Sequence, residues 1–144
     1  MNRITHILVA AILCFCCERS GAKDGDDMKN HQQAETIRFF SGFSGYAHPV
    51  KLTGERPEKE ARALKAYYIA RYDSQGRLVM VKKMLDGKFF FQYDYTYDKG
   101  NKLKMVSFPD ENGSVTKTIT YTEDGRSILR KYNKDGQVVS EDTL

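Results

Sequence analysis

The strongest constraint on the fold is a series of glycines at near-regular spacing in the C-terminal half of the chain. Successive members of the series are 11, 13, 13, 12 and 11 residues apart, and short runs of aliphatic and aromatic residues separate them. Turn signals at about this spacing are typical of an antiparallel meander, a sandwich or a barrel. We therefore expect structural turns at Gly76, Gly87, Gly100, Gly113, Gly125 and Gly136.

The residues beside these glycines are the ones that tight turns require. Asp86-Gly87 favours a two-residue type I′ hairpin, because Asp and Gly tolerate positive φ. Segments 73–76, 123–125 and 134–136 suit a type I turn closed by a left-handed glycine, and 109–113 is a longer version. Six turns imply seven strands, which we place at 66–73, 77–85, 88–98, 102–108, 114–122, 126–133 and 137–141.

Two of these segments alternate clearly between apolar and polar residues. In 88–98, one face is expected to carry Phe89, Phe91, Tyr93, Tyr95 and Tyr97, with polar residues between them. This period of two is expected of a strand and not of a helix. In 114–122, threonine at every second position predicts a solvated face. We take the three tyrosines of the first segment as a candidate binding surface.

One segment in this region carries a recognisable repeat motif. Residues 72–78 read Tyr-Asp-Ser-Gln-Gly-Arg-Leu, which resembles the YD repeat of Rhs-type and teneurin-type proteins. Residues 95–103 form a second copy with Asn101 at the glycine position, and 121–126 and 132–138 are weaker copies. The resemblance implies β-hairpin repeats, but about three hairpins are too few to close a cargo-wrapping shell. The overall pattern also resembles small exported bacterial proteins of unknown function.

Residues 1–22 have the pattern of a signal peptide. Arg3 is followed by an apolar run over 7–15, which is short for a membrane span, and Ser20-Gly21-Ala22 provides a cleavage site before Lys23. The alternative is a buried N-terminal strand or helix. The pattern predicts export, with a periplasmic or secreted product.

All three cysteines of the chain lie inside this segment, at Cys14, Cys16 and Cys17. A zinc site would need a second ligand cluster, and a disulfide framework would need cysteines in the mature domain. The remaining alternative is lipidation at Cys17 or Cys16, which would anchor the protein to the membrane through lipid alone.

The rest of the chain divides into a disordered polar tether at 23–35 and one β-rich domain at 36–144. The tether is rich in aspartate but lacks the spaced ligands of a calcium loop. In the domain we expect a strand at 36–40, then a tight bend, since Ser41-Gly42 and Ser44-Gly45 interrupt the apolar run, and then an extended piece near 50–52. A helix of about two turns is expected within 53–66, starting at Pro57, with Glu58 four residues before Arg62.

These elements define a mainly β fold: an antiparallel meander of about seven strands, with an N-terminal strand and one short helix packed on it. The twist of the strands can curl the sheet toward a half-barrel. The YD-like hairpins extend from about 66 to 142.

No pattern of catalytic residues is visible in the sequence. We expect both His31 and His48 to be exposed, and neither belongs to a triad, a zinc motif or a dinucleotide fingerprint. A polar strand face explains Asp94, and turn chemistry explains Asp98. We therefore predict a protein that is not an enzyme, with no catalytic, metal or cofactor-binding residues and no cofactor.

Tyrosines that stack on bases, interleaved with lysines, could bind nucleic acid. The export signal argues against this function, and acidic residues nearly balance the basic ones. Lysines on strands also prevent edge-to-edge aggregation. The hypothesis is an exported, non-enzymatic binding module of the cell envelope, with an unknown protein or polysaccharide as partner and no nucleic acid. The alternatives are an immunity or antitoxin-like protein, by analogy with repeats found around toxin systems, and a cryptic hydrolase.

Overall fold

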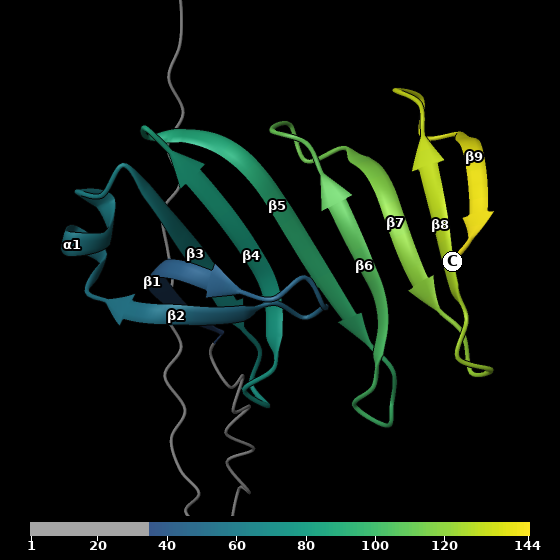
Figure 1. Cartoon of the computed structure of the whole chain (residues 1–144), viewed down its shortest axis with the longest axis horizontal. Helices are drawn as coiled ribbons and strands as arrows, with labels where there is room; N and C mark the ends of the chain where they lie inside the picture. Colours follow the sequence, from purple (N-terminus) through teal and green to yellow (C-terminus); the bar gives the residue numbers. More distant parts are fainter. Residues whose placement is uncertain (1–34) are drawn as a thin grey trace, which may run out of the picture. The chain divides into compact units, whose positions relative to one another are not determined.

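The computed structural model describes residues 35–144, so the predicted signal peptide and most of the predicted tether lie outside the described residues (Figure 1). The described residues form one antiparallel sheet that stays open, in the order β2-β1-β3-β4-β5-β6-β7-β8-β9. The strands are β1 (Thr36–Ser44), β2 (Lys51–Arg56), β3 (Ala66–Tyr72), β4 (Leu78–Leu85), β5 (Lys88–Tyr97), β6 (Leu103–Pro109), β7 (Val115–Tyr121), β8 (Ser127–Tyr132) and β9 (Val138–Thr143), with one helix, α1 (Glu58–Arg62).

The predicted fold class, a mainly β antiparallel meander with one short helix, is confirmed. Strands β3–β9 are the seven strands of the predicted meander, each hydrogen-bonded to the next. The sheet has nine strands because β1 and β2 extend it at the edge of β3. No helix in the described part of the chain is long and apolar enough to cross a membrane.

The turns have the predicted backbone conformations. Asp86 and Gly87 have φ values of 49° and 74°, as a type I′ turn requires. Asn101, with φ of 63°, takes the left-handed position of its turn in place of Gly100, as the alignment of the repeat predicts. The remaining predicted turn glycines are all left-handed: Gly76, Gly113, Gly125 and Gly136.

A side-chain oxygen at the first position organises four of the other turns. Asp73 Oδ1 accepts the backbone N–H groups of Gln75 and Arg77 at 3.0 and 2.9 Å. Asp98, Asp110 and Asn133 accept the equivalent pairs of N–H groups in their turns. Aspartate and asparagine favour such turns because their short side chains replace the missing backbone acceptor. This geometry explains why aspartate recurs in the repeat.

The N-terminal region differs from the prediction in two ways. β1 does not bend at Ser41-Gly42 but continues to Ser44, because pairing with β2 holds it extended beyond Phe40, where its pairing with β3 ends. Residues 53–56 belong to β2, so the helix is only five residues long. Within it, Arg62 and Glu58 form the ion pair that their spacing predicts, at 2.7 Å.

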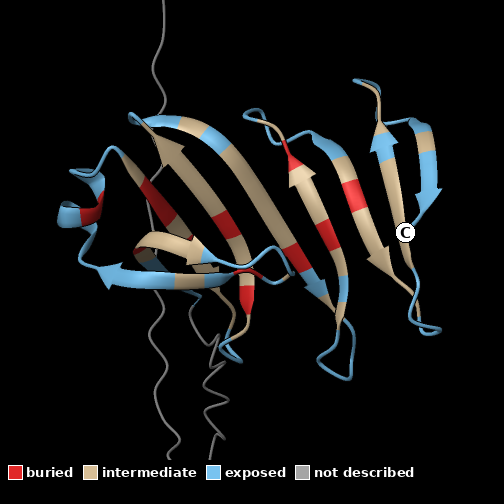
Figure 2. Ribbon diagram, viewed as in Figure 1, coloured by how far each residue is buried: buried red, intermediate tan, exposed pale blue. Residues whose placement is uncertain are grey.

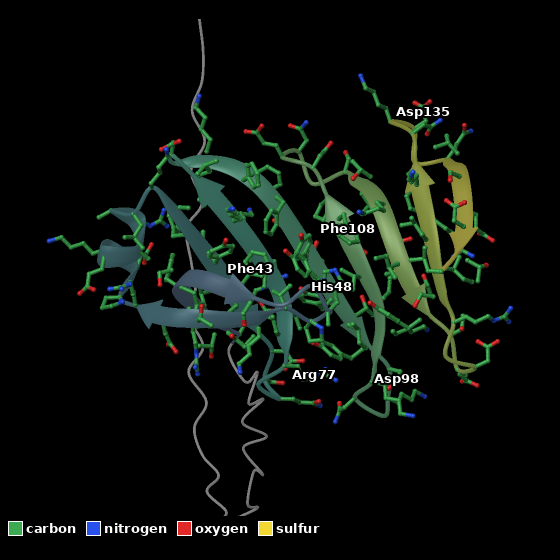
Figure 3. The ribbon with its side chains drawn as sticks, in the orientation of Figure 1. Phe43, His48, Arg77, Asp98, Phe108 and Asp135 are labelled. Atoms are coloured by element: carbon green, nitrogen blue, oxygen red, sulfur yellow. The ribbon has the colours of Figure 1, made fainter. Side chains whose placement is uncertain are left out.

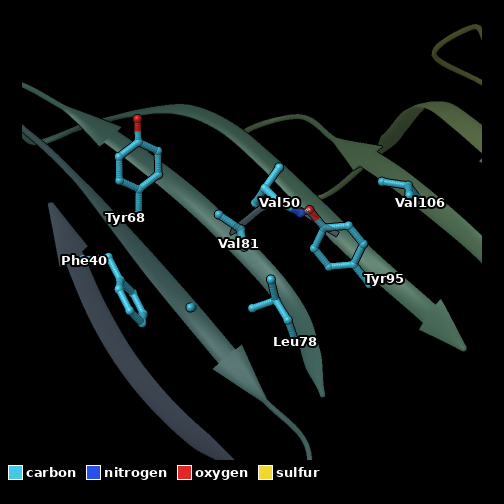
Figure 4. Packing of buried hydrophobic residues seen from close by; sticks show 8 residues of the cluster. Phe40, Val50, Tyr68, Leu78, Val81, Tyr95 and Val106 are labelled. Atoms are coloured by element: carbon cyan, nitrogen blue, oxygen red, sulfur yellow. Dashed lines mark hydrogen bonds between the residues drawn. The ribbon is translucent and has the colours of Figure 1, made fainter. Parts of the chain in front are cut away.

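The β1–β2 hairpin also folds over one face of β3 and β4, which we call the aromatic face (Figure 1). Phe43 packs against Tyr68 and Phe91, with ring centroids 5.3 and 6.3 Å apart. Burial is concentrated under this cover and fades toward β9 (Figure 2). The core, drawn in Figure 4, consists of Phe40, Val50, Tyr68, Ala70, Leu78, Val81, Tyr95 and Val106.

Two details of strand register correct the predicted faces. A register shift between Lys83 and Met84 pairs Phe91 with Lys83 but Phe89 with Met84, so Phe89 does not share the face of Phe91. The threonine face of β7 is not fully solvated either. Thr118 is only 5% exposed, because it lies beneath Tyr132, and its hydroxyl is 3.1 Å from the Tyr132 hydroxyl.

Candidate functional site: an open face on β6–β8

The loop between β1 and β2 places a histidine against the sheet. His48 is half-buried, not exposed as predicted, because its ring packs edge-on against Tyr93 and Phe108 at centroid distances of 5.0 and 5.8 Å. Its Nδ1 atom lies 3.3 Å from the Tyr95 hydroxyl. His31 lies outside the described residues.

The same hydroxyl ties the loop to the core. The Tyr95 oxygen accepts the backbone N–H of Val50 at 3.3 Å, and the Tyr95 side chain is 5% exposed. Burial raises the pKa of Tyr95 well above its ordinary value, so the hydroxyl stays neutral. The prediction of Tyr93, Tyr95 and Tyr97 as a binding surface is therefore wrong for Tyr95, because the His48 loop covers it. Tyr93 and Tyr97 are half-buried.

His48 and its neighbours mark the limit of the covered region. Burial, together with the charge of Lys117, lowers the pKa of His48 below its ordinary value, which favours the neutral ring. The Lys117 Nζ atom lies 3.9 Å from the centre of the Phe108 ring. Figure 3 shows His48 close to Phe108, beside β6.

Beyond this limit the aromatic face continues across β6, β7 and β8 without cover from the described part of the chain (Figure 1). Strand pairing places Phe108 opposite Lys117, and Lys117 opposite Lys131. The next row on this face contains Ile119 opposite Leu129, both half-buried. We call this surface the open face and define it by Lys104, Phe108, Lys117, Ile119, Tyr121, Leu129 and Lys131.

The charged side chains of the described residues divide into two classes. All seven arginines have a carboxylate within ion-pair distance: Arg38, Arg56, Arg62, Arg71, Arg77, Arg126 and Arg130. No lysine among residues 35–144 has such a partner. Like the other described lysines, those of the open face therefore remain available for a ligand.

We call the series of YD-like repeat copies the repeat ladder, and the space between two successive copies a step. At the first step, between residues 72–78 and 95–103, protein side chains fill the space. The Arg77 guanidinium lies 5.0 Å from the centre of the Tyr97 ring and donates to Asn101 Oδ1 at 2.7 Å. The Tyr97 hydroxyl donates to the Leu78 carbonyl at 2.9 Å. Together with the Arg77–Asp73 ion pair, these contacts close the space between two successive hairpins.

The second step has the same backbone but different side chains. Lys102 replaces the arginine, Tyr121 replaces the tyrosine, and Gly125 replaces the asparagine. Arg126 turns away to pair with Asp124. A pocket of about 540 Å³ is left at this step, lined by Asp98, Lys102, Leu103, Lys104, Tyr121, Thr122 and Glu123.

The remaining candidates for chemistry have structural roles. Asp94 accepts hydrogen bonds from Gln92, and Asp98 accepts two backbone N–H groups of its turn. Within residues 35–144, no three His, Cys, Asp or Glu side chains gather closely enough to hold a metal ion. The arrangement of the open face suits binding by hydrogen bonds, charge and apolar contact.

Comparison with known proteins gives one match. Residues 32–130 match the model of a family described as "Family of unknown function (DUF6156)". No curated protein and no solved structure matches the chain. The matched range includes the His48 loop, the pocket at Tyr121 and all of β6 and β7.

Proposed function

This chain belongs to DUF6156, a family of unknown function, and we propose that it is an exported, non-enzymatic binding module of the cell envelope. One observation carries the proposal: Lys104, Lys117 and Lys131 lie without ionic partners on an uncovered sheet face, beside the half-buried Tyr121 and Phe108. Aromatic residues are enriched at recognition surfaces, and unpaired lysines give this surface charge complementarity to an anionic partner.

The backbone beneath the open face is hydrogen-bonded within the sheet. Strands β6, β7 and β8 are hydrogen-bonded to neighbours on both sides, so side chains alone are available to a ligand. A surface held by a paired sheet loses little conformational entropy on binding, which favours affinity from few contacts. The half-buried Ile119 and Leu129 add apolar area between the two groups of lysines.

Export rests on the N-terminal sequence pattern, and the mass of the purified protein tests it. Cleavage after Ala22 would give a mature chain that begins at Lys23, whereas lipidation would give a chain that begins at Cys17 or Cys16. If the protein purified from the cells that produce it still begins at Met1, the export proposal is contradicted. The kinship with YD repeats stays a prediction.

The binding proposal is tested by capture from the envelope fraction with two matched variants. The open-face variant carries Lys104→Gln, Lys117→Gln and Lys131→Gln. The control variant carries Lys59→Gln, Lys82→Gln and Lys88→Gln, which removes the same charge from α1, from the opposite face of β4 and from the start of β5. We expect wild type and control to enrich the same component and the open-face variant to lose it. Equal capture by all three proteins, or none by wild type, would refute the proposal.

A further inference from the structure

The spacing of charge on the open face constrains what can bind there. Lys117 and Lys131 are directly opposite each other on neighbouring strands, about 5 Å apart at Cα. Tyr121 lies four residues further along β7, at a distance of about 13 Å, and Lys104 lines the pocket beside it. The face therefore has one cationic end, an apolar middle and a mixed polar pocket.

The open face carries lysines and not arginines, and this difference bears on which anionic ligands it can bind. A lysine Nζ is a compact point charge on a flexible stem, whereas arginine favours bidentate recognition of a planar or tetrahedral anion. Every described arginine is already ion-paired inside the domain. The open face thus suits anionic groups at variable positions along a polymer.

The pocket distinguishes between polyanions. It combines the cations Lys102 and Lys104 with the carboxylates Asp98 and Glu123. A hydroxyl group both donates and accepts hydrogen bonds, so it can satisfy both kinds of side chain. A phosphate chain without free hydroxyl groups has no donor to offer the two carboxylates. The pocket therefore favours a ligand rich in hydroxyl groups.

The middle of the face suits the apolar face of sugar rings. Ile119 and Leu129 form a half-buried floor between the lysine pair and the pocket that Tyr121 lines. A peptide could not add as an extra strand here, because the backbone groups of β6–β8 are already paired. These contacts give a saccharide more to bind than they give an acidic peptide.

We infer that the ligand of the open face is an acidic polysaccharide, which rests on the proposed binding function. Its carboxylate lies between Lys117 and Lys131, its rings cross Ile119 and Leu129, and hydroxyl groups of the chain enter the pocket at Tyr121. The inference names the chemical class of ligand for the site and the direction in which the polymer runs, along the strands.

Binding of polygalacturonate to the full chain at low salt tests the inference, with dextran as the neutral control. We expect the Lys104→Gln, Lys117→Gln, Lys131→Gln variant to bind at least tenfold more weakly. The Lys59→Gln, Lys82→Gln, Lys88→Gln control should stay within twofold of wild type. Equal losses in both variants, or no binding by wild type, would overturn the inference.

A single variant separates sugar recognition from attraction of charge alone. Glu123→Gln should weaken the binding of polygalacturonate severalfold, because a carboxylate that accepts hydrogen bonds from hydroxyl groups is lost. This weakening is expected although the variant makes the domain more positive. Stronger binding in that variant would overturn the saccharide assignment. So would poly-L-glutamate that binds as tightly as polygalacturonate through the same lysines. In that case capture of an acidic protein from the envelope would still support the proposed function.

Discussion

The β3–β5 region and the β6–β8 region are built from the same kind of hairpin but have different environments. Tyr68, Val81 and Tyr95 on the first are at most 6% exposed beneath the β1–β2 hairpin. Ile119 and Tyr121 on the second are half-buried and have no such cover from the described residues. The repeat pattern therefore sets the strands and turns, while a segment outside the repeat decides which aromatic residues become core.

The two steps of the ladder differ in the same sense. At the first, Arg77 fills the space against Tyr97 and Asn101. At the second, a lysine and a glycine occupy the corresponding positions, and a pocket remains. Loss of a structural contact at one copy of a repeat leaves a cavity without disturbing the backbone, which is a simple way for a repeat to acquire a binding site.

The largest expected effect is a loss of stability on replacing the covered Tyr68, compared with the same replacement at the uncovered Tyr121. Tyr68→Ala should lower the free energy of unfolding by about 3–5 kcal/mol, because it removes a ring packed against Phe43 and Phe91 in a site that cannot refill. Tyr121→Ala should cost less than half as much. The midpoint and slope of urea denaturation measure both changes.

Two further results would bear on this comparison. The same slope in both variants and wild type would show that both changes act on one cooperative unit. Equal destabilisation by Tyr68→Ala and Tyr121→Ala would mean that the second region is as well covered as the first. That result would contradict the description of β6–β8 as an open face.

The fold was largely predictable from sequence because its information is local. The turn glycines, Asn101 and the Asp86-Gly87 pair specify the backbone at each reversal, and reversals at such spacing leave little freedom besides a meander. The N-terminal region was less predictable, because β1 stays extended across Ser41-Gly42 through pairing with β2, and its first half pairs with the distant β3. Pairing between distant segments has no local signal.

The candidate site was predictable only in part. Alternation identified the tyrosines of β5 correctly as one face, but no local rule indicated that the His48 loop would bury Tyr95. Lys117 and Lys131 become neighbours through the register of β7 and β8. Counting back from the turn glycine Gly125 would have placed them opposite each other, and this signal could have found the lysine pair.

The second prediction concerns the pH dependence of the cover. Burial and the charge of Lys117 hold the pKa of folded His48 below the ordinary value of 6.5. His48 therefore binds a proton more readily in the unfolded chain than in the folded one. Its contribution to the free energy of unfolding is fully present above pH 6.5 and declines as the pH falls below that value. The rings in contact with His48 are those of Tyr93, Tyr95 and Phe108, and the charge that acts on it is that of Lys117.

Unfolding measured at pH 7.5 and 5.5 in wild type and in His48→Asn tests this dependence, since all other titrating groups are common to both proteins. Between pH 7.5 and pH 5.5, we expect the free energy of unfolding to fall by up to about 1 kcal/mol more in wild type than in the variant. Partial exposure of the His48 ring limits this difference. Lys117→Gln should reduce the difference. A pH dependence unaffected by His48→Asn would show that the loop does not hold the ring neutral.

The smallest expected effect converts the open step of the ladder into a copy of the closed one. Lys102→Arg combined with Gly125→Asn would place a guanidinium over Tyr121 and an amide in reach of it, as Arg77, Tyr97 and Asn101 are placed. Asparagine tolerates the left-handed φ of 83° at position 125. We expect a gain of about 0.5 kcal/mol in the free energy of unfolding from the cation–π contact. Polygalacturonate binding should weaken because the pocket is filled. A variant that gains stability and still binds as wild type would show that the pocket is not part of the binding site, and would confine the ligand to the lysine pair on β7 and β8.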